Sequence, residues 1–148
     1  MAFFSGLCSI ALLLLAIGYI FQIPLLQQLP ADARISAAVM FILIGFTHLL
    51  KPRKLSYMIE GMIPWPVFTV LFTGVLELLL GIGLLIPSIQ YYAGWGLMIL
   101  LVAMFPANIR VAVLNLLAPG GLPSKPWYIW SRLLFQPVYI LWIWWAIN

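Results

Sequence analysis

Five long apolar stretches constrain this chain more than any other feature of its sequence. They cover residues 3–26, 35–50, 66–85, 91–110 and 127–147, and polar or proline-rich segments separate them. A helix that crosses the hydrocarbon core of a bilayer, about 30 Å thick, needs about 20 apolar residues. Charged residues make up 7% of the chain, whereas a soluble domain usually has about 25%. The sequence therefore predicts an all-α integral membrane protein with five transmembrane helices.

The ends of three stretches need separate consideration. The first lacks the basic n-region of a signal peptide, so we expect it to be a retained transmembrane helix. The second is short, but residues 31–34 can add a turn with Asp32 as its N-cap. The fourth has two open interpretations, because it either continues past Arg110 or bends there to lie along the interface.

The basic residues predict an orientation. Five spans place the N-terminus and the loops 51–65 and 111–126 on one side of the membrane. That side carries Lys51, Arg53, Lys54, Arg110, Lys125 and Arg132, and the other side carries Arg34. The positive-inside rule then makes the N-terminus cytoplasmic and places the C-terminus outside. The expected location is the plasma membrane, of the bacterial or archaeal inner-membrane type.

Glu77 is the most informative single residue. Counted from Pro66 at 1.5 Å per residue, it lies about 16 Å deep, near the bilayer middle. An ionisable side chain there is costly and usually faces the bundle interior at a functional site. Gly74 and Gly81 share its helix face, where small residues let a second helix approach closely. A functional carboxyl and a carboxyl that only joins two helices explain this pattern equally well.

His48, three residues after Gly45, is the second candidate. It is expected within a turn of the cytoplasmic end of its helix, where an imidazole bonded to a carbonyl or a lipid headgroup is the simpler interpretation. A metal site is not expected, because metal ions need several convergent ligands and His48, Glu60 and Glu77 are predicted at different depths. Glu77 and His48 are the candidate catalytic residues, neither of them certain.

Two prolines interrupt predicted helices near further polar side chains. Pro106 and Pro137 each remove a backbone N–H, which leaves the carbonyls of Val102 and Leu133 to be satisfied by other groups. We expect a polar pocket in the cytoplasmic leaflet. The residues expected to converge on it are His48, Glu77, Asn108, Arg132 and Gln136. The alternative is two ordinary kinks whose carbonyls are capped by amides.

Several motifs together resemble those of DoxX-like membrane proteins. They are GFTHLLKP, MIPWPVF, TGVLELLLGIGLLIP, AGWGLMILLVAMFPANI and RLLFQPVYILW, spread over about residues 35–146. The matching positions are His48, Pro52, Pro64, Glu77, Gly81, Pro106, Asn108, Arg132 and Gln136. The chain departs from the family pattern at Leu49, where phenylalanine is usual, and at Thr73, where serine is usual. The resemblance implies a four-helix membrane domain over residues 30–148, with residues 1–29 as an additional transmembrane helix.

The resemblance also implies a role near redox chemistry, because DoxX-like proteins are associated with quinone-linked sulfur and thiol oxidation. We expect a redox-associated subunit that binds a quinone or lipid in the predicted pocket. Trp65 and Phe105 would flank the ring of the ligand, and Gly45, Gly74, Gly81, Pro106 and Pro137 would be structural. No intrinsic cofactor is expected, and Cys8, the single cysteine, excludes a dithiol mechanism within one chain.

Two further hypotheses stay open. The first is a non-catalytic accessory subunit or assembly factor of a larger membrane oxidoreductase or respiratory complex, for which the additional first helix would bind the partner. Such a chain could also form homo-oligomers. The second is a lipid or small-molecule transporter, favoured by the proline-interrupted helices but not by five spans without a convincing repeat. No nucleic-acid motif is present, and the basic residues are too sparse for such a surface.

Overall fold

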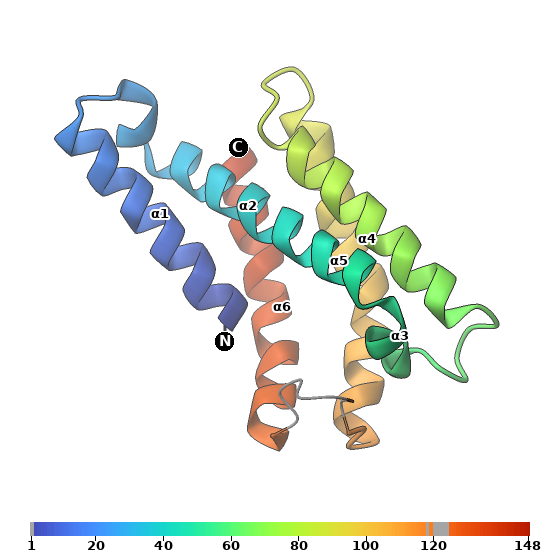
Figure 1. The fold of residues 1–148 in the computed structure, drawn as a ribbon. Helices are drawn as coiled ribbons and strands as arrows, with labels where there is room; N and C mark the ends of the chain where they lie inside the picture. The colour runs from blue at the N-terminus through green and yellow to red at the C-terminus, as the bar shows by residue number, and fades with distance from the viewer. Residues whose placement is uncertain (1, 118, 120–124) are drawn as a thin grey trace.

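The computed structural model describes residues 2–117, 119 and 125–148, and within them the chain is all-helical without a strand. The long helices are α1 (Ala2–Ile20), α2 (Leu29–Leu50), α4 (Pro66–Gly83), α5 (Gln90–Val113) and α6 (Pro126–Ile147), shown in Figure 1. The short elements are the 3-10 helix η1 (Pro24–Gln27), the single-turn helix α3 (Pro52–Leu55) and the 3-10 helix η2 (Ser56–Met58).

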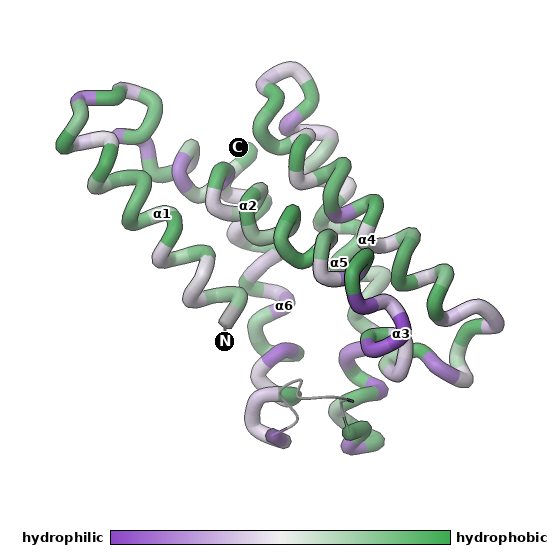
Figure 2. Tube along the Cα trace, in the orientation of Figure 1, coloured by the Kyte–Doolittle hydropathy of each residue, from purple (hydrophilic) through white to green (hydrophobic). Residues whose placement is uncertain are grey.

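Within the described residues, four helices are long and apolar enough to cross a membrane, namely α1, α2, α4 and α5. Helix α6 has 22 residues, as many as α2. On the Kyte–Doolittle scale tryptophan is slightly hydrophilic, so the five tryptophans of α6, together with Arg132 and Gln136, lower its mean hydropathy. Figure 2 shows hydrophobic residues along most of α1 and α4, and hydrophilic residues gathered at α3. The predicted all-helical membrane class therefore holds at the level of these four helices.

Two predicted helix boundaries are wrong. Helix α1 ends at Ile20, and the rest of the first apolar stretch forms a turn and η1, because Pro24 has no N–H for continuing the helix. Helix α2 begins at Leu29, with Gln28 at the cap position. Asp32 is therefore not an N-cap. It lies in the first turn of α2 and is fully buried there.

Helix α5 resolves the two interpretations of the fourth stretch, since it continues through Arg110 to Val113. Pro106 lies inside α5, and Pro137 lies inside α6. Helix α5 therefore presents one continuous wall from the α4–α5 turn to its far end.

The helices associate as pairs. Helix α2 packs most extensively along α4, α5 along α6, and α1 against α2. The indole Nε1 of Trp142 on α6 donates a hydrogen bond to the carbonyl of Ala33 on α2, over 3.0 Å. This hydrogen bond links α6 to α2 and so joins the pair α5–α6 to the pair α2–α4, at the end of the bundle where α2 begins.

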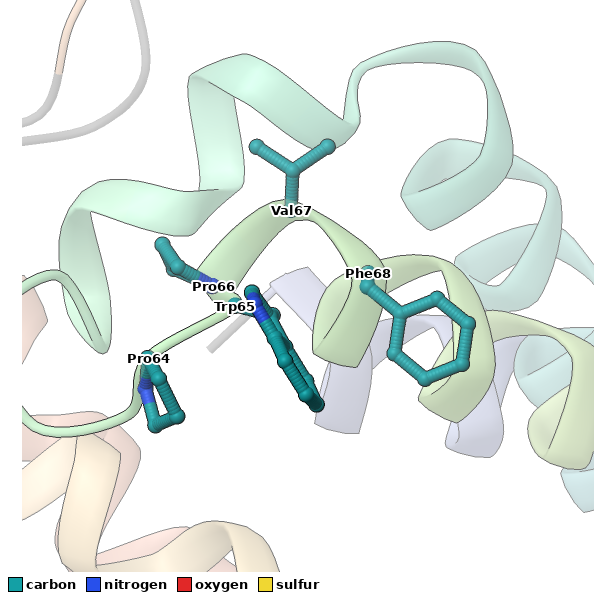
Figure 3. Close-up of a pocket in the computed structure, with 5 residues that line it drawn as sticks. All are labelled: Pro64, Trp65, Pro66, Val67 and Phe68. Atoms are coloured by element: carbon teal, nitrogen blue, oxygen red, sulfur yellow. The ribbon is translucent and has the colours of Figure 1, made fainter.

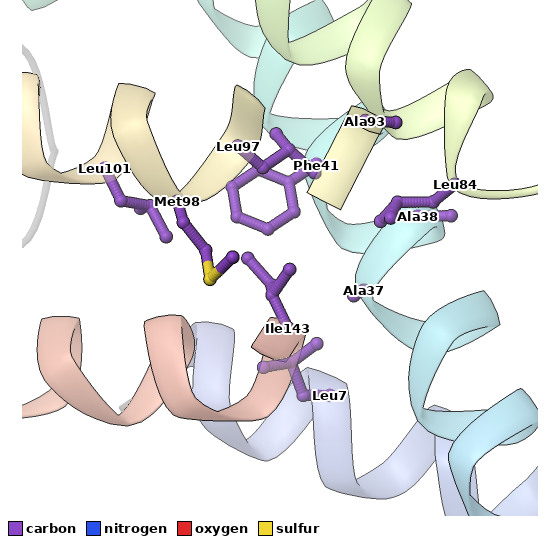
Figure 4. Packing of buried hydrophobic residues seen from close by; sticks show 10 residues of the cluster. All are labelled: Leu7, Ala37, Ala38, Phe41, Leu84, Ala93, Leu97, Met98, Leu101 and Ile143. Atoms are coloured by element: carbon purple, nitrogen blue, oxygen red, sulfur yellow. The ribbon is translucent and has the colours of Figure 1, made fainter. Parts of the chain in front are cut away.

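The main hydrophobic core lies where the long helices meet (Figure 4). It consists of Leu7, Ala37, Ala38, Phe41, Leu84, Ala93, Leu97, Met98, Leu101 and Ile143. Its three alanines allow close backbone approach, as is common where membrane helices pack. A second cluster contains Val111, Ala112 and Ile129, farther along α5 and α6. The candidate site lies between these clusters along α5.

Candidate ligand-binding site

The crossing of α2 and α4 is formed by glycines. A Cβ atom on Gly45 would lie 2.8 Å from the backbone carbonyl oxygen of Gly74, and one on Gly74 would lie 2.7 Å from the Cβ of His48. A Cβ on Gly81 would lie 3.3 Å from the carbonyl oxygen of Ala38. Each glycine thus fills a position where any side chain would push the two backbones apart.

This close approach brings His48 and Glu77 together. The Nδ1 atom of His48 lies 2.5 Å from Oε2 of Glu77, and the Glu77 side chain is 2% exposed. The prediction that they lie at different depths is therefore wrong. Each depth was counted from the end of its own helix, but α2 and α4 cross at an angle (Figure 1). Both helices carry a glycine three residues before the ionisable residue, and this shared spacing is the sequence signal for the pair.

A cavity of about 450 Å³ lies between α4 and α5. Its polar lining residues are His48, Thr69, Thr73 and Asn108. Apolar side chains form the rest of the wall, including Leu76 and Leu80 of α4, Ile99, Leu100 and Met104 of α5, and Leu55, Met58, Ile59 and Ile63 of the segment between α2 and α4. Glu77 does not line the cavity, so it contacts the site through His48.

A second pair of polar residues connects α5 to α6. The Nδ2 atom of Asn108 donates to Oε1 of Gln136 over 3.0 Å, and Nε2 of Gln136 donates to the carbonyl of Leu101 over 2.5 Å. Gln136 is 4% exposed. The amide of Gln136 thus bonds to the carbonyl of Leu101. The carbonyl that Pro106 was expected to free belongs to the next residue, Val102. Asn108 lines the cavity and Gln136 lies behind it.

Two arginines hold the segment that closes one side of the cavity. The Nη1 atom of Arg110 donates to the carbonyls of Tyr57 and Met58, over 3.3 and 3.1 Å. The Nη2 atom of Arg132 lies 3.9 Å from the sulfur of Met58. Arg132 therefore does not line the cavity but supports Met58, which does. Arg110 thereby anchors η2, a role for which the sequence has no local signal.

The two aromatic residues predicted to flank a ligand ring also lie outside the cavity. Trp65 is 72% exposed and, with Pro64, Pro66, Val67 and Phe68, lines a separate hollow at the start of α4 (Figure 3). Phe105 is half-buried on α5 and is not part of the cavity wall. Neither residue is therefore placed to flank the ring of a ligand in this cavity. The helix face on which a residue lies decides this, and hydropathy alone does not define that face.

The described residues contain no group of three or more histidine, cysteine, aspartate or glutamate side chains that could hold a metal ion. His48 and Glu77 form a two-residue pair, fewer ligands than the sites that proteins use to retain metal ions. At the cavity, the imidazole of His48 and, behind it, the carboxyl group of Glu77 can supply hydrogen bonds and exchange protons.

Comparison with known proteins bears on the region that contains this site. A family model described as a domain of unknown function, DUF8561, matches residues 37–147. The chain belongs to this family. No curated protein and no solved structure matches it.

The matched DUF8561 region includes most of α2 and all of α4, α5 and α6. His48, Glu77, Asn108 and Gln136 all lie within it. Helix α1 precedes the matched region, although its Leu7 is part of the main core. The cavity and both polar pairs are thus features of the family domain, and α1 packs onto that domain from outside the match.

Proposed function

We propose that this protein binds a quinone or a similar amphiphilic lipid in the cavity between α4 and α5. The observation that carries the proposal is an apolar cavity with two hydrogen-bonding residues in its wall, each bonded to a buried polar residue behind it. The volume of about 450 Å³ is in the range of ligand sites, about 300–1,000 Å³, which usually combine apolar walls with a few fixed polar groups.

The His48–Glu77 pair gives this site its proton chemistry. In lipid the least costly state of the pair has no net charge. In that state Nε2 of His48 carries a proton, whether the shared proton lies on Nδ1 or on the carboxyl group. Nε2–H can then donate a hydrogen bond to a ligand oxygen, such as a quinone carbonyl.

The same pair would serve a redox-associated subunit. A quinone that accepts two electrons also takes up two protons to become a quinol. His48 would donate one of them from Nε2 while the proton shared with Glu77 moves onto Nδ1. The second proton, and the proton that restores the neutral pair, would come from water at the mouth of the cavity. The electrons would come from a partner oxidoreductase, because one cysteine gives the chain no dithiol. Glu77 is then a positioning and proton-exchange residue that acts through His48.

A tail for the ligand has a natural place on the other side of α5. A second hollow of about 650 Å³ lies between α5 and α6 and is lined by apolar residues. Ile99 and Ala103 line both this hollow and the cavity between α4 and α5. A ligand whose head group lies at His48 could therefore extend an apolar tail over these two residues.

We further propose that all five long helices cross the membrane and that α2, α4, α5 and α6 form a DoxX-like bundle. Helix α6 has 22 residues, about 33 Å at 1.5 Å per residue, which suffices for a bilayer of about 30 Å. The basic residues Lys51, Arg53, Lys54, Arg110 and Arg132 would face the cytoplasm, with Arg34 outside. The cavity would then open in the cytoplasmic leaflet of a plasma membrane.

Binding of a short-chain quinone to the purified full chain in detergent tests the proposal. We expect saturable binding by the wild-type protein and weaker binding by Glu77→Gln, because an amide oxygen that accepts from Nδ1–H holds the neutral imidazole of His48 in the tautomer that lacks a proton on Nε2. Thr73→Val is the matched control, since Thr73 lines the same cavity but its hydroxyl already bonds to Val70 of its own helix. Equal binding by wild type and Glu77→Gln would remove Glu77 from the mechanism, and absence of saturable binding would contradict the proposal.

An accessory role in a larger membrane complex is the second candidate. It is favoured by the second half of α1, where Leu12, Leu13, Tyr19 and Ile20 are exposed and free to contact another membrane helix. We expect a partner, or a second copy of the chain, to remain bound during purification in mild detergent. A chain that always purifies as a lone monomer would contradict this candidate and leave ligand binding unaffected.

A further inference from the structure

Two arginine side chains from different helices meet at one residue of η2. The Nη1 atom of Arg110 on α5 donates to the backbone carbonyl of Met58 over 3.1 Å. The Nη2 atom of Arg132 on α6 lies 3.9 Å from the sulfur of the same residue. Both arginines are half-buried. Two groups that stay positively charged in proteins therefore border the same residue.

The chain itself does not neutralise these two charges. Its three acidic side chains are Asp32, Glu60 and Glu77. Asp32 is buried in the first turn of α2, at the other end of that helix, and Glu77 is bonded to His48. Within the described residues, no lysine or arginine forms an ion pair with a carboxylate. A half-buried charge without a counter-ion is costly, so we expect an anion from outside the chain.

Each guanidinium group also has unused hydrogen-bond donors. Arginine has five N–H donors. Arg110 uses Nη1 for the carbonyls of Tyr57 and Met58, and Arg132 uses Nη2 for one weak contact with sulfur. The other donors of both arginines have no hydrogen-bond partner in the part of the chain that the structure describes. Guanidinium groups bind phosphate oxygens in pairs, so these donors suit a phosphate group.

The positions of both arginines along their helices match the depth of lipid head groups. Arg132 follows Pro126, the first residue of α6, by six residues, or about 9 Å at 1.5 Å per residue. Arg110 lies in the last turn of α5. Trp127 and Trp130, near the start of α6, are exposed, as tryptophans at a membrane interface are. From this depth, long arginine side chains can reach the head groups.

We propose that Arg110 and Arg132 bind the phosphate group of an anionic phospholipid at the η2 end of α5 and α6. Basic pockets between membrane helices are typical sites for anionic head groups. Lys51, Arg53 and Lys54, which are exposed at α3, add positive charge that favours an anionic over a zwitterionic lipid. The proposal depends on membrane insertion of α5 and α6, but not on a ligand in the cavity between α4 and α5.

Native mass spectrometry of the full chain in a non-ionic detergent tests the proposal by counting bound lipids. The probes are phosphatidylglycerol, which is anionic, and phosphatidylcholine with the same acyl chains, which is zwitterionic. The measured quantity is the ratio of their two affinities, and no cavity ligand is present. The proteins compared are wild type, Arg132→Gln, Arg132→Lys and Arg34→Gln. Arg34 is the matched control, because it is also half-buried but lies near the start of α2, at the opposite end of the bundle.

We expect wild type to prefer phosphatidylglycerol. Arg132→Gln should lower this preference about fivefold, the usual contribution of one basic residue near a membrane surface. Arg132→Lys should keep most of the preference, because an ammonium group also binds phosphate, and Arg34→Gln should keep all of it. Since Arg132 makes one weak side-chain contact, Arg132→Gln should unfold without lipid at nearly the wild-type temperature.

Four results would overturn the proposal. Absence of a preference in wild type, or an unchanged preference in Arg132→Gln, would remove the site. An equal fall in Arg132→Gln and Arg34→Gln would show that net charge selects the lipid, and an equal fall in Arg132→Gln and Arg132→Lys would show that Arg132 acts through packing.

Inorganic phosphate distinguishes a lipid head group from a free anion. If it raised the unfolding temperature of wild type as much as phosphatidylglycerol does, and had no effect on Arg132→Gln, the ligand would be the free anion and the proposed lipid would be wrong. None of these outcomes changes the expectation for quinone binding in the cavity between α4 and α5.

Discussion

Glu77 and His48 depend on one another inside the bundle. A lone carboxyl at 2% exposure would be among the most costly groups in a membrane protein. Without Glu77, the imidazole of His48 would lose its hydrogen bond of 2.5 Å. Removing one partner of a buried pair leaves the other unsatisfied, whereas removing both can cost little.

A double-mutant cycle on this pair follows. We expect Glu77→Leu and His48→Leu each to lower the free energy of unfolding by about 3 kcal/mol, since each leaves a buried polar partner behind. The double variant should lose less than the sum, with a coupling energy of about 1–3 kcal/mol. Unfolding in detergent solution measures all four proteins, and additive losses would show that the pair is not coupled.

The residues of the site were more predictable than their arrangement. The cost of polar groups in lipid identifies Glu77, Gln136 and Asn108 from sequence, whatever they contact. The partners are set by the helix crossing. The glycine three residues before His48 and before Glu77 marks that crossing in the sequence, but the depth of each residue was counted along its own helix, so their pairing was missed. Arg132 was assigned to the pocket for its charge, but its long side chain reaches Met58 instead.

At the scale of helices, the distance between the α2 and α4 backbones decides whether this pair can form. Helix α4 begins at Pro66 as predicted, because proline favours the first position of a helix. The early start of α2 at Leu29 was missed, since Asp32 has the composition of a cap although it is buried. Composition thus locates helices within the chain, and packing decides which polar residues are inside.

The glycine crossing gives a prediction with an internal control. In Gly45→Ala the new Cβ would lie 2.8 Å from the Gly74 carbonyl oxygen, so the helices must separate at a cost of about 1–3 kcal/mol. In Gly96→Ala the nearest atoms belong to the flexible side chain of Leu80. This control should be neutral or gain up to about 1 kcal/mol from helix propensity.

Thermal unfolding in detergent compares these two alanine variants. Equal stability of both would mean that α2 and α4 do not depend on close backbone contact.

Helix α5 separates the cavity at His48 from the hollow between α5 and α6, and Ala103 of α5 lines both. We expect Ala103→Phe to weaken binding of long-chain amphiphiles about tenfold or more, because the ring would occupy the path of the tail, at about 0.8 kcal/mol for each CH₂ that loses its contacts. Short-chain ligands should bind as to wild type. A chain-length series measured on both proteins checks this, and an equal loss for short and long chains would contradict the assigned path.

At the scale of the whole molecule, α1 is part of the fold although the family match begins at residue 37. Leu7 is 1% exposed in the main core, and the ring of Phe3 lies 4.5 Å from that of Tyr139 on α6, between centroids. We therefore treat α1 as packed onto the family domain through its first half.

Leucine-to-alanine substitutions on α1 test this assignment. Leu7→Ala should lower the free energy of unfolding by about 2–5 kcal/mol, the usual cost of a cavity in a core. Leu12→Ala is the matched control, because Leu12 is 64% exposed on the same helix, and its loss should be below about 1 kcal/mol. Equal small effects in detergent unfolding would mean that α1 does not contribute to the core.

The class of the molecule followed from composition, because 7% charged residues cannot cover a water-facing surface. The cavity did not follow from composition, since its walls come from α2, α4, α5 and the segment that contains η2. Such a set is assembled only by tertiary contacts, among them the bonds from Arg110 to Tyr57 and Met58. The all-helical membrane class and the polar residues could therefore be predicted from the sequence, but the cavity between α4 and α5 could not.

The most direct test of the central claim, that a ligand occupies the cavity at His48, uses the fact that His48 is the only histidine. Nuclear magnetic resonance of the full chain with isotope-labelled histidine reports one imidazole, and a para-alkylphenol serves as the ligand. We predict a saturable shift of the Nε2 signal, with little change at Nδ1, which stays bonded to Glu77. An Nε2 signal that does not move at saturating ligand would contradict the account.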